Sequence, residues 1–417
     1  MFQYCRKKQD MHCVGIIAEY NPFHLGHAYQ IKEIRKRLPE AGIIALMSGS
    51  FTQRGEPALL DKWERAGLAL KGGCDLVLEL PFAFACCSAQ AFARGGAQLL
   101  SRLGIAGTLA FGAECDDLER LREAAQAIDS PSFQQQLHQK IKNGTAYASA
   151  IEELLSFKDN SDFIRKPNNI LALEYLRALN GTPNLSPLLI QRRGAGYHSR
   201  ELQAPLPSAS ALRLALYERR LTQSEAEQAA PPATARRLLE LTERELPCMD
   251  RLYPSLQLAL LRKSSEGLRL IYGMEEGLEN RLQQAAAAPC YREFIKEAVS
   301  RRYPATRLQR LCLHLLLGFD RETAAAFHQA GPLYARLLAV GPRGREMLKE
   351  IKAHSSLPLI AKTTQFLNSN QRKKNLQELS PLQQMLSFDT WATELRELTM
   401  PRSKATNDFN QSPIFFM

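Results

Sequence analysis

Short apolar runs alternate with amphipathic segments along the first half of the chain. The apolar runs are typical of buried strands and lie at 14–18, 42–49, 75–81 and 107–112. Helical spacing of apolar residues marks the segments around 28–38, 61–71, 89–103 and 117–128. Because strands that alternate with helices form parallel sheets, we predict an α/β fold with an N-terminal doubly wound parallel sheet. Ligands of such sheets bind at the carboxyl ends of the strands.

The second half of the chain has a different pattern. From about residue 216 the apolar spacing is mostly helical, as in segments 216–229, 233–245, 291–302 and 306–319. The tail after Pro401 has little periodicity. We therefore predict an extension at 1–10, a catalytic domain at 11–215, a mostly α-helical region at 216–400 and a flexible tail at 401–417.

Charge divides the chain in the same way. Residues 1–190 carry 21 Lys and Arg against 20 Asp and Glu, whereas residues 191–417 carry 33 against 23. A basic second half favours contact with a polyanion such as RNA, although a merely solvated basic surface is the alternative. The densest basic patch comprises Arg301, Arg302, Arg307 and Arg310, and a second comprises Arg372, Lys373 and Lys374.

Composition narrows the class of protein. A chain of 417 residues with 45% hydrophobic and 23% charged residues is ordinary for a globular protein of two or three domains. The most apolar window, which begins at Asp75, is interrupted by Glu79 and Pro81, so no membrane span is expected. Nine cysteines without a C-x-x-C motif indicate reduced thiols and a cytoplasmic location.

The first candidate site follows the first predicted strand. Asn21 and Pro22 form a turn, and His24 and His27 then share one face of a helix that we expect to begin near Phe23. At a helix N-terminus two imidazoles can donate hydrogen bonds to nucleotide phosphate oxygens, with Gly26 allowing close approach. Alone, the pattern H-x-G-H also fits a surface pair or part of a metal site.

A second candidate site lies at the start of a predicted helix near residue 208. Ser208, Ser210 and Arg213, in the sequence SASALR, are suited to hold the β and γ phosphates of ATP. A plain serine N-cap is the alternative.

Other candidates follow later strands. Gly112 leaves room for a base or ribose, and Asn168 or Asn169 caps the helix at 167–179 or contacts a nucleotide. Arg192 and Arg193 follow a predicted strand as candidate phosphate ligands. Gln53 and Arg54 could reach substrate, while Asp61 with Lys62 could open the next helix.

The motifs in this order resemble a known family. Strand, turn, HLGH and helix, followed by SASALR, resemble the nucleotidylyltransferase superfamily. Together with SFTQRGEPALLDKW, GGCDLVLELP, FGAEC, PNNILALEY and RRGAGYH, they resemble the tRNA(Met) cytidine acetate ligases from Met11 to about Phe366.

This resemblance implies a reaction and a site. Members of the family form acetyl-adenylate from ATP and acetate and transfer the acetyl group to N4 of the wobble cytidine of elongator tRNA(Met). We expect Mg²⁺ to accompany ATP without a protein metal site, and His24 and His27 to be catalytic. The implied ATP site comprises Ile17, Ala18, Glu19, Tyr20, Asn21, Pro22, Phe23, His24, Gly26, His27, Gln30, Gly112, Asn168 and Arg193.

Three points stay open at this stage. The choices between Asn168 and Asn169, and between Arg192 and Arg193, are uncertain by one residue. An adenylyltransferase for a free metabolite and a non-catalytic RNA-binding protein remain alternative functions.

Overall fold

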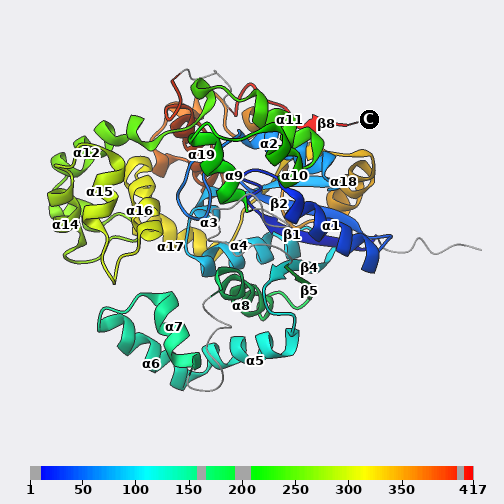
Figure 1. Ribbon diagram of the computed structural model, residues 1–417, viewed down its shortest axis with the longest axis horizontal. Coiled ribbons are helices and arrows are strands. Elements are labelled where there is room, and N and C mark those ends of the chain that lie inside the picture. The colour runs from blue at the N-terminus through cyan, green and yellow to red at the C-terminus, as the bar shows by residue number, and fades with distance from the viewer. Residues whose placement is uncertain (1–10, 157–165, 193–207, 402–407, 417) are drawn as a thin grey trace, which may run out of the picture.

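A central sheet of eight strands organises the computed structural model, which describes residues 11–156, 166–192, 208–401 and 408–416 (Figure 1). The strands are β1 (Cys13–Ala18), β2 (Gly42–Ser48), β3 (Leu76–Leu80), β4 (Ala106–Ala113), β5 (Ser186–Gln191), β6 (Ala335–Val340), β7 (Leu359–Ile360) and β8 (Ile414–Phe415). The order across the sheet is β5-β4-β1-β2-β3-β6-β7, and β8 pairs with β6. The five strands from β5 to β3 are all parallel, as predicted.

Side chains that alternate along each strand divide between two cores. Ile17 and Leu46 face one core, whereas Ile16 and Ala45 face the other. The first face is covered by α4 (Ala89–Arg102), α8 (Pro167–Leu179) and α18 (Pro342–His354), and the second by α1 (Leu25–Arg37), α2 (Lys62–Lys71) and α9 (Ala209–Tyr217). Burial on both faces explains why the strands are continuous apolar runs.

Short helices connect these layers. The short α3 (Phe82–Ala85) packs against α4, and α10 (Gln223–Ala229) packs against α11 (Pro232–Glu240). Between β4 and α8 in the sequence, α5 (Leu118–Asp129), α6 (Pro131–Lys142) and α7 (Tyr147–Ser156) lie below the sheet in Figure 1. Within the described residues, 3₁₀ helices span Glu243–Glu245, Met249–Arg251, Thr363–Gln365, Gln371–Lys373 and Leu376–Glu378.

A helical lobe with its own apolar core lies beside the sheet, at the left of Figure 1. Its core includes Leu256, Phe294 and Leu308. The lobe consists of α12 (Tyr253–Arg262), α13 (Ser265–Arg269), α14 (Leu278–Ala285), α15 (Tyr291–Ala298) and α16 (Ala305–Leu317). Two further helices, α17 (Arg321–Ala330) and α19 (Pro381–Glu397), contact α3. Helices thus dominate the second half, as predicted.

The second half also returns to the sheet, which the helical pattern did not predict. The apolar run ARLLAV forms β6, which pairs antiparallel with β3. The flexible tail expected from residue 401 is wrong for residues 408–416, because Asp408 is 1% exposed and β8 pairs with β6. Buried ion pairs and strand pairing hold this segment in place.

A buried cluster of charged side chains explains the position of Asp408. The Lys62 Nζ atom lies 2.9 Å from Glu79 Oε1 and 2.8 Å from Asp408 Oδ1. Arg336 makes ion pairs with the same two carboxylates, at 3.1 and 3.0 Å. Opposite charges are paired in this way inside the fold, as buried charges must be. The cluster joins α2, β3 and β6 to the chain beyond α19.

None of the helices in the described ranges is both long enough and apolar enough to cross a membrane.

Candidate active site

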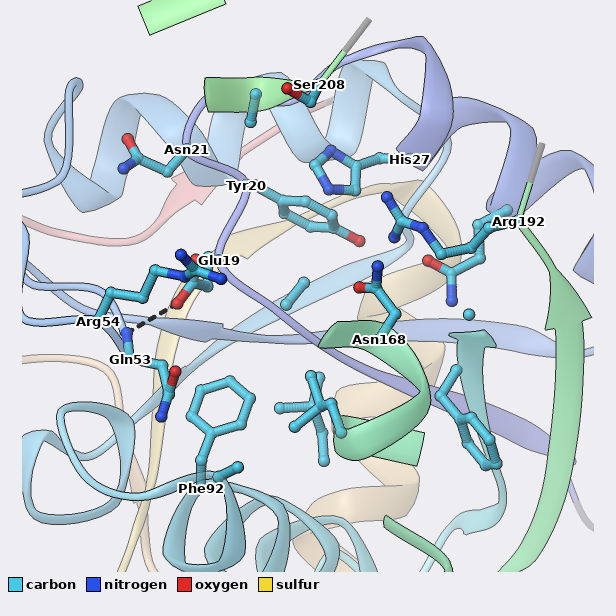
Figure 2. Close-up of a pocket in the computed structure, with 18 of the residues that line it drawn as sticks. Glu19, Tyr20, Asn21, His27, Gln53, Arg54, Phe92, Asn168, Arg192 and Ser208 are labelled. Atoms are coloured by element: carbon cyan, nitrogen blue, oxygen red, sulfur yellow. Dashed lines mark hydrogen bonds between the residues drawn. The ribbon is translucent and has the colours of Figure 1, made fainter. Parts of the chain in front are cut away.

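A cavity of about 230 Å³ lies where β1, β2, β4 and β5 reach their carboxyl ends (Figure 2). Polar groups come from the ends of these strands and from the starts of α1, α8 and α9. Its apolar wall is formed by Ala89, Phe92, Phe111, Ile170, Leu171 and Tyr175. This is the edge at which a doubly wound sheet binds its ligands.

Most of the predicted nucleotide-site residues line this cavity. They are Ile17, Ala18, Glu19, Tyr20, Asn21, His24, His27, Gln30, Gly112, Asn168, Arg192, Ser208 and Arg213. Pro22, Phe23, Gly26 and Ser210 do not line it, and Arg193 lies outside the described residues. Residues far apart in the sequence therefore form one site.

The two histidines are oriented by the backbone of the first turn of α1. His24 is the N-cap, and its Nδ1 accepts a hydrogen bond of 2.9 Å from the Gly26 amide. His27 Nδ1 accepts one of 3.2 Å from the His24 amide. Because each Nδ1 is an acceptor, a neutral ring carries its proton on Nε2. Each imidazole can therefore donate from Nε2.

Burial keeps both imidazoles neutral. Desolvation, with the positive charges of Arg192 and Arg213, lowers the pKa of His24 to about 3. Desolvation also lowers the pKa of His27, helped by His24 and Arg192. The ring centroids are 3.8 Å apart. The pair is thus a set of neutral donors suited to charge that develops on a phosphate.

Gly26 has a different role from the predicted one. A Cβ atom at this position would lie 2.6 Å from His24 Cε1 and 2.9 Å from His24 Nδ1. The glycine therefore makes room for the capping imidazole, and it does not line the cavity. Phe23 is likewise structural, since it is 1% exposed and its ring lies 5.5 Å from that of His27.

The second predicted signature forms the start of α9. Ser208 is the N-cap of this helix and accepts a hydrogen bond of 3.1 Å from the Ala211 amide. Arg213 donates to Asn21 O at 2.8 Å and to Glu56 Oε2 at 2.9 Å. The guanidinium thus connects α9 to the turn after β1. The two signatures meet as predicted.

The asparagine prediction is corrected in part. Lys166 is the N-cap of α8, because Pro167 occupies the first helical position, which suits proline. Asn169 is 1% exposed, and its Oδ1 accepts hydrogen bonds from the amides of Glu114 and Cys115. Asn168 lines the cavity and donates to Glu114 Oε1 at 2.5 Å. Neither asparagine caps the helix.

Sequence reasoning missed Arg65, which is fully buried on α2. Its guanidinium donates to Glu19 O at 2.5 Å, to Ser48 O at 3.1 Å and to Gly49 O. It therefore connects the carboxyl ends of β1 and β2. An arginine on the same helical stripe as Leu68 and Ala69 was the available signal.

Some arginines of the basic patch in the helical lobe form ion pairs with acidic side chains. Arg302 Nη2 lies 2.8 Å from Glu275 Oε2, and Arg307 makes an ion pair with the same carboxylate. Arg301 is largely exposed, with Glu153 at 3.7 Å. Arg310 instead donates to Gln53 O at 3.2 Å, in a loop that lines the cavity. The four arginines therefore do not form one uniform surface.

Comparison with known proteins identifies the family. The chain matches the HIGH nucleotidyl transferase family over residues 11–412. It is 36% identical to the tRNA(Met) cytidine acetate ligase of Syntrophomonas wolfei, over 97% of this chain and 99% of that protein. The chain belongs to this family of ligases. The ligase of Halothermothrix orenii is 35% identical over 94% of this chain and 96% of its own length.

Solved structures from the family share the fold. Thermotoga maritima TmcAL is 29% identical, with a TM-score of 0.87 over 97% of this chain and all of that chain. A second crystal form, bound with alpha-thio ATP, has a TM-score of 0.85 over the same share of both chains.

Proposed function

We propose that this ligase activates acetate with ATP and transfers the acetyl group to N4 of the wobble cytidine of elongator tRNA(Met), in the cytoplasm. The observation that carries the proposal is the pair of Nε2 donors at the carboxyl edge of the sheet. The names of the relatives, and the ATP analogue bound to Thermotoga maritima TmcAL, support the same reaction.

In the first step an acetate oxygen attacks the α-phosphorus of ATP, and pyrophosphate leaves. His24 and His27 donate hydrogen bonds to phosphate oxygens as negative charge builds on them. Arg192, Ser208 and Arg213 are proposed to hold the phosphates that leave, while Ser210, which accepts a hydrogen bond of 3.5 Å from Arg213, would support that guanidinium. No covalent bond to the protein forms.

Mg²⁺ is expected to arrive with ATP. Within the described residues no three His, Cys, Asp or Glu side chains converge as a metal site. Phosphate oxygens and water would supply most of its ligands, and the ion would neutralise phosphate charge.

The helical lobe is proposed to bind tRNA through Arg301, Arg302, Arg307 and Arg310. Phosphate contacts made by arginines depend strongly on salt, so affinity should fall steeply as ionic strength rises. Acetylation also requires the target base to leave its stack and enter the cavity.

One experiment tests the proposal. Labelled pyrophosphate should exchange into ATP only when acetate is present, and label from acetate should then appear in added tRNA. Absence of exchange with any small carboxylate would contradict ligase chemistry. Exchange without labelled RNA would favour an enzyme that acts on a free metabolite, and RNA binding without exchange would favour a non-catalytic protein.

A further inference from the structure

The cavity has a second chemical region, formed by Glu19, Gln53 and Arg54 (Figure 2). Glu19 follows β1, and Gln53 and Arg54 belong to the loop after β2. In Figure 2 these side chains lie on the opposite side of the cavity from Arg192. Because the neutral donor His24 and the cations Arg192 and Arg213 suit the phosphates, we assign the region around Glu19 to the acyl acceptor.

Glu19 differs from the other residues that line the cavity because its side chain is acidic. Among the described lining residues it is the only carboxylic acid. Its Oε1 accepts a hydrogen bond of 2.7 Å from the Gln53 amide, and no other hydrogen bond to its carboxylate occurs in the described part of the chain. The second carboxylate oxygen can therefore accept a proton from a ligand.

The remaining titratable groups in the cavity cannot accept a proton near neutral pH. Each histidine uses Nδ1 as an acceptor and carries its proton on Nε2. Burial raises the pKa of Tyr20 and of Tyr175, so both phenols hold their protons. The arginines are already cations. This leaves Glu19 as the one proton acceptor among the described lining residues.

Gln53 adds a second acceptor beside Glu19. Its Nε2 donates to Cys87 O at 2.8 Å, which leaves Oε1 as an acceptor. The backbone amide of the same residue contacts Glu19, and its carbonyl accepts a hydrogen bond from Arg310 of the helical lobe. An amine with two N–H groups matches two acceptors on one side of the cavity.

We propose that Glu19 is the general base for acyl transfer, and that Gln53 Oε1 accepts the second N–H of the attacking exocyclic amine. This inference rests on the proposed function. The N4 lone pair of cytosine is delocalised into the ring, so attack on the acetyl carbon needs removal of a proton as positive charge develops on nitrogen.

Acyl transfer forms one bond to the acetyl carbon and breaks another. The N4–C bond forms, the bond from the acetyl carbon to the phosphate oxygen of the adenylate breaks, and AMP leaves. One N4 proton passes to Glu19, which releases it to water after the products depart.

Several charged groups act on Glu19. Desolvation raises the pKa of its carboxyl, while the Gln53 hydrogen bond and the charges of Arg213 and Arg54 lower it in part. The titratable groups that interact electrostatically with the Glu19 carboxyl are those of Arg54, Glu56, Arg65, Cys86, Tyr175 and Arg213. A general base works when deprotonated, so transfer should fall as pH falls through this raised pKa.

The test compares two acceptors of the same adenylate. Hydroxylamine is a strong nucleophile that reports adenylate formation as acetohydroxamate without a base, whereas tRNA requires one. In Glu19→Gln the side-chain oxygen still accepts from Gln53 N, but the base is lost. We expect tRNA acetylation in single turnover to fall about 100-fold or more relative to hydroxamate formation. The rise of the transfer rate with pH should also disappear.

The controls separate the possible roles of Glu19. Glu19→Asp should restore part of the transfer, and Glu19→Ala should lose the contact with Gln53 as well as the base. An equal loss of both products in Glu19→Gln would overturn the proposal. A loss of hydroxamate that added Mg²⁺ restores would assign the carboxylate to the metal instead. Failure of the proposed function is recognised separately, since wild-type protein would then form no acetohydroxamate.

Discussion

The sheet domain and the helical lobe both pair charged groups, but they do so in different surroundings. Lys62, Arg336, Glu79 and Asp408 are at most 2% exposed at their side chains. In the lobe, the side chains of Arg302, Arg307 and Glu275 are 41%, 29% and 33% exposed. Water screens the second group, whereas the first depends on its internal partners.

The cavity and the helical lobe are suited to bind anions in two different ways. Within the cavity the donors are neutral imidazoles that the backbone orients before any ligand arrives. Such donors act over one hydrogen bond and suit charge that develops during a reaction. Arginines of the lobe keep their charge and can exchange one anionic partner for another. These arginines are suited to bind a polyanion, which they attract over a longer range and through contacts that depend on salt.

The largest expected effect comes from removing one buried charge. Asp408→Ala removes one of the two carboxylates that form ion pairs with both Lys62 and Arg336, so we expect the free energy of unfolding to fall by about 3–5 kcal/mol. Urea denaturation measures this change. The double variant Lys62→Met with Asp408→Leu restores charge balance and should recover much of the loss. A single variant as stable as the wild type would show that the cluster behaves like a surface ion pair.

The next effect separates the two nitrogens of His24. Asn can replace Nδ1 as the N-cap acceptor but has no donor at the position of Nε2. We therefore expect His24→Asn to keep the wild-type melting temperature while acetate-dependent pyrophosphate exchange falls about 10²–10³-fold. The matched variant His24→Ala should lose both the cap and the exchange. Near-normal exchange in His24→Asn would mean that the imidazole serves only to cap α1.

The smallest effect concerns Glu275. Glu275→Gln removes the acid shared by Arg302 and Arg307, so their charges become available to phosphates. Because exposed ion pairs are worth about 0.2–1 kcal/mol, tRNA affinity should rise by up to about fivefold, with a steeper dependence on salt. Filter binding across a salt series measures both. The control Glu293→Gln, which frees only Lys296 on α15, should change binding less. Weaker binding in Glu275→Gln would indicate that these arginines support the fold.

Local patterns were enough to predict the first half of the sheet. The strands β1 to β4 and the helices α1, α2, α4 and α5 begin and end within three residues of their predicted limits, because each has a clear apolar pattern. The short helix α3 was not predicted. The N-cap role of Ser208 was also visible, since a serine precedes an apolar helix. These features depend on neighbours in the sequence.

Features that depend on distant partners could not be predicted in the same way. Whether ARLLAV joins the sheet depends on the free edge of β3, and the burial of Asp408 depends on Lys62 and Arg336. Asn169 resembles a helix cap, but its amide is held by the backbone of Glu114 and Cys115. Sequence spacing does not reveal which of these contacts will form.

The ion pair between Lys62 and Asp408 joins residues that are 346 positions apart. During synthesis the sheet strands β1 to β3 emerge first, yet Lys62 and Arg336 meet their second carboxylate only after almost the whole chain has been made. A prematurely terminated chain would therefore keep uncompensated positive charge in its interior. The cluster makes chain completion a condition for stability, so incomplete products should be recognised and degraded instead of accumulating as partly active protein.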